Sequence, residues 1–178
     1  MVIDSSLSHV ELKLQAQAKL ARSRGLGPEI ITFLWRLLHR LLPTQDRLHR
    51  IVRITTPSPN CKHCQDQVPE DLAHAFFGCN FNSNAGTLLL RSLSSLVPGI
   101  TAPQILCLSL PVDISDELPV VWLISNFLNI IWINRVEKKR VQLFQTRAEL
   151  EARTTLLRET RFSEYISKIL NLIQVAFE

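Results

Sequence analysis

The sequence has few of the residues that build fibres, tight-turn arrays or membrane spans. Its 178 residues include only five glycines and nine prolines, with no repeat, which excludes collagen-like and low-complexity chains. Hydrophobic residues make up 46% and charged residues 20%, so a disordered chain is not expected. The most apolar stretch, residues 120–133, is interrupted by polar residues and is shorter than the ~20 residues that span a membrane. We therefore expect no segment that crosses a membrane.

Motifs of several enzyme classes are also missing. The aromatic-x-Asp-Asp motif, which holds the metal ions of a polymerase palm, does not occur, and neither does Gly-x-Ser-x-Gly or Gly-x4-Gly-Lys-Ser/Thr. Asp113, Asp116 and Glu117 are the only candidates for a nuclease site. Acidic residues at the start of a helix explain these three better. We expect a binding module rather than an enzyme.

The chain also lacks the cysteine pattern of a secreted protein. Its N-terminus has no basic segment followed by an apolar stretch, so we expect no secretory leader. Of four cysteines, Cys61, Cys64 and Cys79 cluster within nineteen residues, with a histidine among them. In a reducing compartment such a cluster is typical of a metal site. We expect an intracellular protein and leave nucleus and cytoplasm open.

The spacing of apolar residues predicts an all-α fold, because long strand-like alternation is missing. A capping-box start and Gly25 predict a first helix over about 8–24. Pro28 at the first position opens a second helix, which Pro43 ends and which carries Arg36 and Arg40 one turn apart. Thr44 caps a short third helix whose Leu48, Ile51 and Val52 are predicted to face inward.

The second half of the sequence is predicted to be helical as well. A Leu-rich helix covers about 85–96, and a short segment follows over 101–108. A long C-terminal helix begins near residue 117 and extends as far as 158, with one break. A final amphipathic helix is predicted over 162–173. We divide the chain into an N-terminal helix (1–27), a helical zinc-knuckle region (28–100) and a C-terminal helical region (101–178).

One short motif carries metal chemistry. Cys61, Cys64, His74 and Cys79 form the pattern C-x2-C-x9-H-x4-C. Two cysteines two residues apart share a tight turn, so both thiolates can reach one tetrahedral ion. Residues 69–71 are predicted to start a helix carrying His74, and a left-handed Gly78 to end it and return Cys79. Three cysteines and one histidine favour Zn²⁺ in a closed, non-catalytic site, here called a CCHC zinc knuckle.

The alternative for this motif is a set of buried apolar cysteines with a hydrogen-bonded core histidine. The spacing favours zinc over that alternative. His63 also lies on the turn, and we predict that it stays outside the ligand set. Cys107 lies in an apolar segment and is predicted to be an ordinary core residue.

Positive charge is concentrated beside the motif. Residues 36–65 have a net charge of +5, whereas residues 66–120 have −5. We call the cations of the first segment the basic block: Arg36, Arg40, Arg47, Arg50, Arg53 and Lys62. Such a block is typical of a surface that faces a polyanion, and a helix face that only keeps the domain soluble is the alternative.

The motif and the helix before it resemble a known family. Residues 34–48 (LWRLLHRLLPTQDRL), Cys61-x2-Cys64 and Glu70-Asp71-x2-His74-x4-Cys79 resemble the zinc-binding region that follows the polymerase in LINE-type (non-LTR) retrotransposon reverse transcriptases. The resemblance covers about residues 30–82, and Ile131-Trp132-x2-Arg135 resembles a downstream helix of animal members. It implies that the four motif residues bind zinc and that Thr44 and Asp46 are structural. It places Glu70 and Asp71 beside the ligands or at a helix N-terminus.

The resemblance also implies a function. It describes a non-catalytic module that helps a reverse transcriptase hold template RNA or target DNA, with RNA, DNA and the polymerase part of the same retroelement protein as partners. The basic block would bind phosphates, and Trp35 would stack on a base unless it lies in the core, where Leu-rich helices usually place tryptophan. The alternative function is a structural or protein-interaction domain in which zinc only stabilises the fold.

Overall fold

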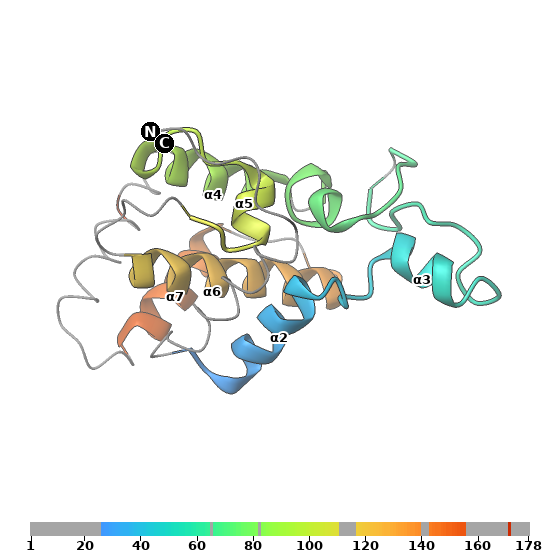
Figure 1. The fold of residues 1–178 in the computed structure, drawn as a ribbon, viewed down its shortest axis with the longest axis horizontal. Coiled ribbons are helices and arrows are strands. Elements are labelled where there is room, and N and C mark those ends of the chain that lie inside the picture. Colours follow the sequence, from blue (N-terminus) through green and yellow to red (C-terminus); the bar gives the residue numbers. More distant parts are fainter. Residues whose placement is uncertain are drawn as a thin grey trace.

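The computed structural model describes residues 26–64, 66–81, 83–110, 117–139, 143–155 and Asn171. These residues are mostly helical and contain no strand, apart from an isolated antiparallel bridge between Asn60 and Pro69. The elements are α2 (Pro28–Leu38), α3 (Gln45–Ile51), the π-helical turn η1 (His74–Gly78), α4 (Ser83–Leu96), α5 (Ala102–Leu106), α6 (Glu117–Val136) and α7 (Leu143–Thr155) (Figure 1). The helix predicted over 8–24 lies outside the described residues, as does that over 162–173 except for Asn171.

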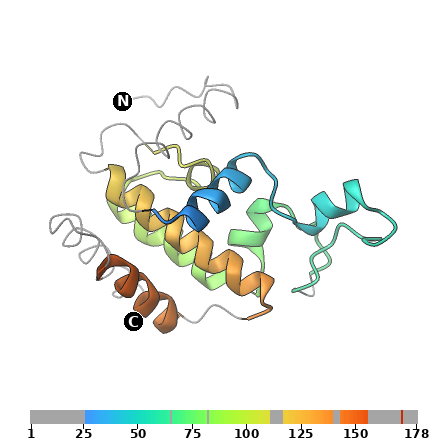
Figure 2. The ribbon, with the colours of Figure 1, turned by 90° about the horizontal axis from the view of Figure 1, so that it is seen from below.

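Helix α6 is the centre of the fold. Residues 120–131 are all buried, on every side of the helix, because α2, α4, α7 and η1 pack against it. Figure 2 shows α6 in orange with α2 and α4 alongside. A helix that is apolar all round belongs in the interior of a protein or a membrane. Among the described residues, no helix is long and apolar enough to cross a membrane.

The polar residues that interrupt this apolar stretch are bonded within the core. Asn126 donates to the carbonyl of Trp122 at 2.9 Å, and its own Oδ1 accepts from Arg153 Nη1 at 2.8 Å. Arg153 lies on α7 and also donates to Asn129 at 3.4 Å. Since a buried amide is costly without partners, these bonds fix the side of α6 on which α7 docks.

Helices α2, α5 and α6 end in the same way. Arg40, Leu108 and Lys138 have positive φ angles of 55°, 51° and 57°. After α2, the amide of Leu41 donates to the carbonyl of Arg36 at 2.6 Å, and α5 and α6 end with equivalent bonds. This is the Schellman motif, which usually has glycine at the left-handed position. Helix α2 therefore ends before the predicted limit at Pro43, so that Arg40 lies beyond it, and the break predicted in the long C-terminal helix falls after Val136, between α6 and α7.

Helix α3 differs from the prediction in what it buries. Its cap is as predicted, since Thr44 Oγ1 accepts from the amide of Arg47 at 3.4 Å. However, no residue of α3 is buried, and Ile51 and Val52 are 62% and 43% exposed. The inward-facing prediction is wrong for Ile51 and Val52, because α3 projects from the body formed by the other described helices (Figure 1), and Leu48 is half-buried.

Helix α4 packs against η1 at unusually short range. The helix is close to the prediction but begins at Ser83. A Cβ atom at Gly86 would lie 1.9 Å from the carbonyl oxygen of Phe76, so only glycine fits there. This close approach sets η1, which begins with His74 of the metal motif and is followed by Cys79, against the core.

Candidate metal centre

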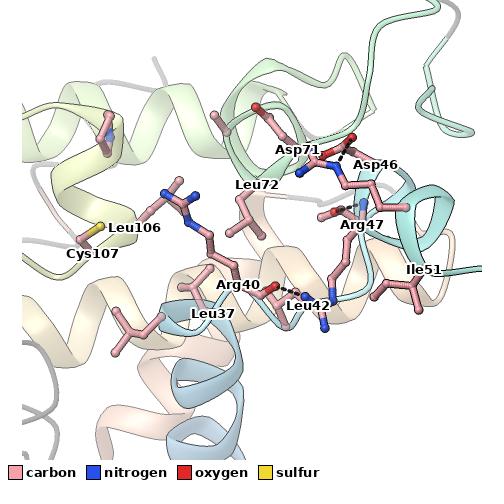
Figure 3. A pocket seen from close by; sticks show the side chains of 15 residues that line it. Leu37, Arg40, Leu42, Asp46, Arg47, Ile51, Asp71, Leu72, Leu106 and Cys107 are labelled. Carbon is pink, nitrogen blue, oxygen red and sulfur yellow. Dashed lines mark hydrogen bonds and ion pairs between the residues drawn. The ribbon is translucent and has the colours of Figure 1, made fainter. Parts of the chain in front are cut away.

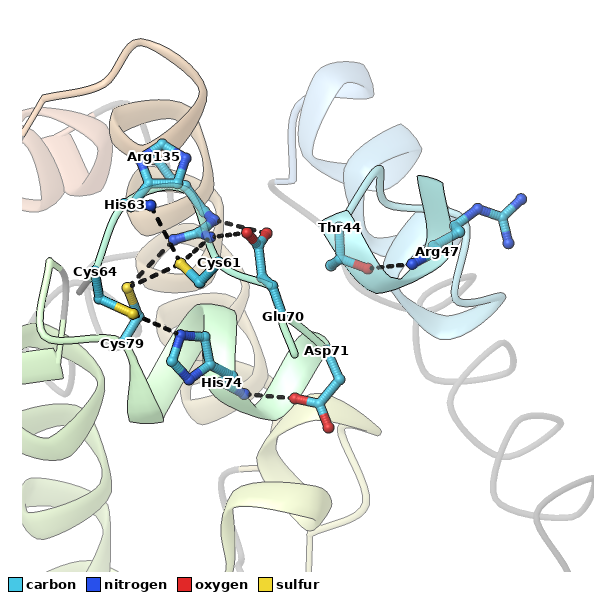
Figure 4. Close-up of polar contacts among 10 residues, drawn as sticks. All are labelled: Thr44, Arg47, Cys61, His63, Cys64, Glu70, Asp71, His74, Cys79 and Arg135. Atoms are coloured by element: carbon cyan, nitrogen blue, oxygen red, sulfur yellow. Dashed lines mark hydrogen bonds and ion pairs between the residues drawn. The ribbon is translucent and has the colours of Figure 1, made fainter. Parts of the chain in front are cut away.

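The four motif residues meet in one cluster. One ligand atom from each of Cys61, Cys64, His74 and Cys79 lies within 4.8 Å of every other (Figure 4). The Sγ atoms of Cys61 and Cys79 are 3.7 Å apart, and Cys64 Sγ is 3.4 Å from His74 Nε2. Ligands at ~2.3 Å (S) and ~2.0 Å (N) from a tetrahedral zinc ion would be about 3.5–3.8 Å apart. The cluster fits Zn²⁺, as the sequence predicts, and its cysteines form no disulfide.

A short loop with antiparallel ends positions the first pair of ligands, Cys61 and Cys64. The amide of Cys61 donates to the carbonyl of Val68 at 2.9 Å, and that of Glu70 donates to Pro59 at 2.9 Å. These bonds flank the bridge between residues 60 and 69. The backbone therefore returns on itself, so that Cys61 and Cys64 lie beside the start of the next helical segment.

The second pair of ligands comes from the two ends of η1: His74 is its first residue, and Cys79 follows its last. Asp71 caps this segment, since its Oδ1 accepts from the amide of His74 at 2.7 Å. The amide of Cys79 then donates to the carbonyl of His74 at 2.7 Å, an i to i+5 bond that widens the turn. This bond brings His74 and Cys79 together across the x4 spacing. The predicted left-handed conformation of Gly78 is wrong, because the π-helical turn itself brings Cys79 back toward His74.

A buried arginine from the core helix completes the surroundings of the cluster. Arg135, in the last turn of α6, donates from Nη2 to Cys61 Sγ at 3.4 Å and from Nη1 to Cys79 Sγ at 3.7 Å. Its Nε donates to Glu70 Oε1 at 3.2 Å, and the ion pair to Oε2 measures 2.5 Å. Both side chains are 3% exposed. The two positions predicted for the acidic residues are thus both occupied: Glu70 lies beside the ligands, and Asp71 lies at the helix N-terminus.

The cluster holds its thiols in different states. Burial acts to raise the pKa of Cys61, but the hydrogen bond from Arg135 and the backbone amides of His63 and Cys64 keep this pKa below its ordinary value. For Cys64, burial and the neighbouring Cys61 and Cys79 raise the pKa to about 12. Cys61 is therefore better prepared than Cys64 to bind as a thiolate, and a metal ion must displace the proton of Cys64.

The other sequence candidates lie outside the cluster. The amide of His63 donates to Cys61 Sγ at 3.4 Å, while its half-buried ring packs on Phe81 with the centroids 5.2 Å apart. Cys107 is half-buried and lines a groove, so it is not the core residue predicted. Asp113 and Asp116 lie outside the described residues, and Glu117 begins α6.

The basic block lies on the surface beside the metal centre. All of its residues except the half-buried Arg47 are exposed: Arg36, Arg40, Arg50, Arg53 and Lys62. Arg40, Arg47 and Arg50 line a groove of about 570 Å³ between the α2–α3 connection, residues 71–73 and α5 (Figure 3). Asp46 and Asp71 line it as well, and Asp46 forms an ion pair with Arg50. The structure therefore gathers half of the basic block in one place.

The position of Trp35 also differs from the core position that is usual for a tryptophan in a Leu-rich helix. It is 49% exposed and therefore not a core residue. Its ring packs on that of His39, the residue that follows the last residue of α2, with the centroids 4.7 Å apart. Leu34 and Leu37 occupy the buried side of the helix instead. An exposed indole beside arginines is available to a planar ligand.

Sequence reasoning gave Arg135 no role in the site. Its partners Cys61 and Cys79 lie 74 and 56 residues away in the chain, so no local spacing could associate them. The available signal was a lone arginine at the end of an otherwise apolar helix, in the Ile131-Trp132-x2-Arg135 pattern. A charge that enters the core needs a buried partner.

The comparisons with known proteins agree with this centre. A family model described as "zinc-binding in reverse transcriptase" matches residues 7–85, which include all four residues of the metal cluster. No curated protein and no solved structure matches the chain. The matched segment is thus similar to a zinc-binding region of reverse transcriptases and contains a cluster that fits Zn²⁺.

Proposed function

We propose that this chain is a non-catalytic zinc-binding module that binds nucleic acid. It would serve as the region after the polymerase of a non-LTR retrotransposon reverse transcriptase, where it holds template RNA or target DNA. Zinc would hold the loop of Cys61 and Cys64 against η1, and so keep the adjoining basic residues in place. The zinc ion has a structural role, because three cysteines and one histidine leave no open position for substrate.

The exposure of the basic block is the observation that carries this proposal. Six cations and a single carboxylate lie within residues 36–65, and that carboxylate, Asp46, is paired with Arg50. The remaining cations are available to phosphates, whose neutralisation supplies most of the non-specific affinity for nucleic acids. Trp35 adds an exposed ring on which a base can stack.

The test is fluorescence anisotropy of labelled single-stranded RNA and duplex DNA with the zinc-loaded chain over a range of salt concentrations. We expect affinity to fall steeply with salt, and Arg40→Gln and Arg53→Gln each to lower the slope of log affinity against log salt by about 1. Arg91→Gln is the matched control, because Arg91 is exposed on α4 and outside the basic block. Salt-independent binding, or no binding by the folded chain, would refute the proposal.

A specific observation favours a second candidate, a domain that docks on a protein partner such as the polymerase. We call residues 51–54 the α3 tip; its Ile54 is 97% exposed. The tip is held in place, since His49 Nδ1 lies 2.8 Å from the carbonyl of Thr56 and the amide of Thr56 donates to Val52 at 3.0 Å. An ordered, exposed apolar segment is typical of a protein contact.

The two candidates give different results with the same variants. If the chain docks on a polymerase through the α3 tip, Ile54→Ser weakens capture of the polymerase fragment and leaves nucleic-acid binding intact. If nucleic-acid binding is the function, Arg40→Gln and Arg53→Gln have the larger effect, and it appears without any polymerase present.

A further inference from the structure

Arg135 uses its whole guanidinium group within the metal centre. Each of its three nitrogens has a partner there: Nε contacts Glu70, Nη1 contacts Cys79 and Nη2 contacts both Cys61 and Glu70. The side chain comes from α6, the most deeply buried of the described helices, whereas its partners come from the metal-binding loops. One residue therefore connects the metal centre with the core.

The charges around the metal centre explain why a cation belongs there. Zinc bound by three thiolates and a neutral imidazole has a net negative charge. Cys61 and Cys79 are 7% and 1% exposed, so water contributes little to stabilising that charge. Hydrogen bonds from a guanidinium to the two sulfurs compensate it, and Glu70 orients the guanidinium by binding its other edge.

Glu70 extends the connection to a further element. Its carbonyl accepts from the amide of Asp46, in the first turn of α3, at 3.2 Å, and its own amide donates to Pro59 at 2.9 Å. Its side chain meanwhile binds Arg135. The loop that carries Glu70 is thus bonded to α3, to the connector before Cys61 and to α6.

We propose that Arg135 is a positioning residue of the zinc centre, which strengthens zinc binding through the sulfurs of Cys61 and Cys79 and makes the docking of the metal-binding loops on α6 depend on zinc. The inference requires zinc binding but not the proposed nucleic-acid binding. A buried residue that only fills space would not change zinc affinity when it is replaced, whereas replacement of Arg135 should.

The first test is the zinc affinity of the full chain, measured by competition with a chromophoric chelator. Arg135→Met keeps the apolar stem and removes the guanidinium, so we expect an affinity about 10–100-fold lower. Arg135→Lys keeps the charge but cannot bridge Glu70 and both sulfurs, and it should recover only part of the loss. Arg153→Met is the control: it removes a partly buried arginine that binds α6 residues away from the cluster, and zinc affinity should stay unchanged.

A second readout responds to the sulfurs directly. With Co²⁺ in place of Zn²⁺, loss of the hydrogen bonds to the thiolates in Arg135→Met should move the sulfur-to-cobalt charge-transfer band to lower energy, and Arg153→Met should not move it. Hydrogen exchange tests whether zinc binding and the docking on α6 are coupled. Chelation of zinc should speed exchange of the last-turn amides of α6 in the natural sequence and not in Arg135→Met.

The results that overturn the inference are equally definite. A folded Arg135→Met chain with the natural zinc affinity and the natural cobalt spectrum refutes it. If Arg135→Met does not fold, the variants Arg135→Lys and Glu70→Gln decide instead. Natural zinc affinity and a natural cobalt spectrum in both variants would refute the inference. A weaker affinity together with a shifted band in Arg135→Lys supports it.

Discussion

Helices α6 and α3 are held in opposite ways. Along α6, residues 120–131 are all buried, and packing against four other elements fixes the helix. No residue of α3 is buried, and the helix depends on its Thr44 cap, the Asp46–Arg50 ion pair and bonds to the metal-binding loop. The residues predicted to contact nucleic acid lie around α3. The packed part of the described chain thus supports the metal centre, while the proposed binding surface lies on the part with the least core of its own.

The largest effect should come from a cavity in the packed part. Leu128→Ala empties a fully buried position in the middle of α6, and we expect a loss of about 2–5 kcal/mol in the free energy of unfolding. Val136→Ala on the same helix is the control, because Val136 is 61% exposed and should change little. Urea denaturation followed by circular dichroism measures both. Equal effects would mean that α6 is not the core of the fold.

A smaller loss is expected where the core approaches the metal centre. In Gly86→Ala, the new methyl group would lie 1.9 Å from the carbonyl oxygen of Phe76, so α4 and η1 must move apart. We expect a loss of about 1–3 kcal/mol in the free energy of unfolding, together with weaker zinc binding, since η1 begins with His74 and is followed by Cys79. Arg91→Ala, at an exposed position of α4, should affect neither. A Gly86→Ala chain as stable as the natural one would contradict the close packing.

The next effect should be confined to α3. Thr44→Ala removes the side-chain oxygen that accepts from Arg47, and we expect about 1 kcal/mol less local stability. Hydrogen exchange of the α3 amides is the measurement, with those of α6 as internal reference. Thr32→Ala, which removes a hydroxyl bonded to the carbonyl of Pro28 within α2, is the matched control and should leave exchange in α3 unchanged. Faster exchange in α6 after Thr44→Ala would mean that α3 belongs to the core.

The smallest effect on stability should come from the α3 tip. Ile54 is 97% exposed, so Ile54→Ser should change the free energy of unfolding by less than about 0.5 kcal/mol. Chemical denaturation checks this. A substantial loss would show that Ile54 is covered by another part of the chain.

The sequence predicted the parts of the structure that depend on neighbours in the chain. The ligands of the metal cluster lie within nineteen residues, and the starts at Pro28 and Thr44 follow from cap chemistry at single positions. The ends of α2, α5 and α6 could not be predicted, because arginine, leucine and lysine stand where the Schellman motif usually has glycine.

Long-range packing accounts for the remaining differences. The apolar residues of α3 look like a core face, yet their burial depends on whether another element covers them, which no local pattern shows. Trp35 is exposed for the same reason, since α2 turns its Leu34 side toward the core. Arg135 reaches the metal cluster only because α6 crosses beneath the metal-binding loops.

The most direct test of the central claim is zinc X-ray absorption spectroscopy on the purified full chain, combined with its metal content. We expect one zinc ion per chain, with three sulfur ligands at ~2.3 Å and one nitrogen at ~2.0 Å. In Cys79→Ser, one sulfur should be lost from this set. A chain that binds no zinc, or that binds it without three sulfur ligands, would contradict the account.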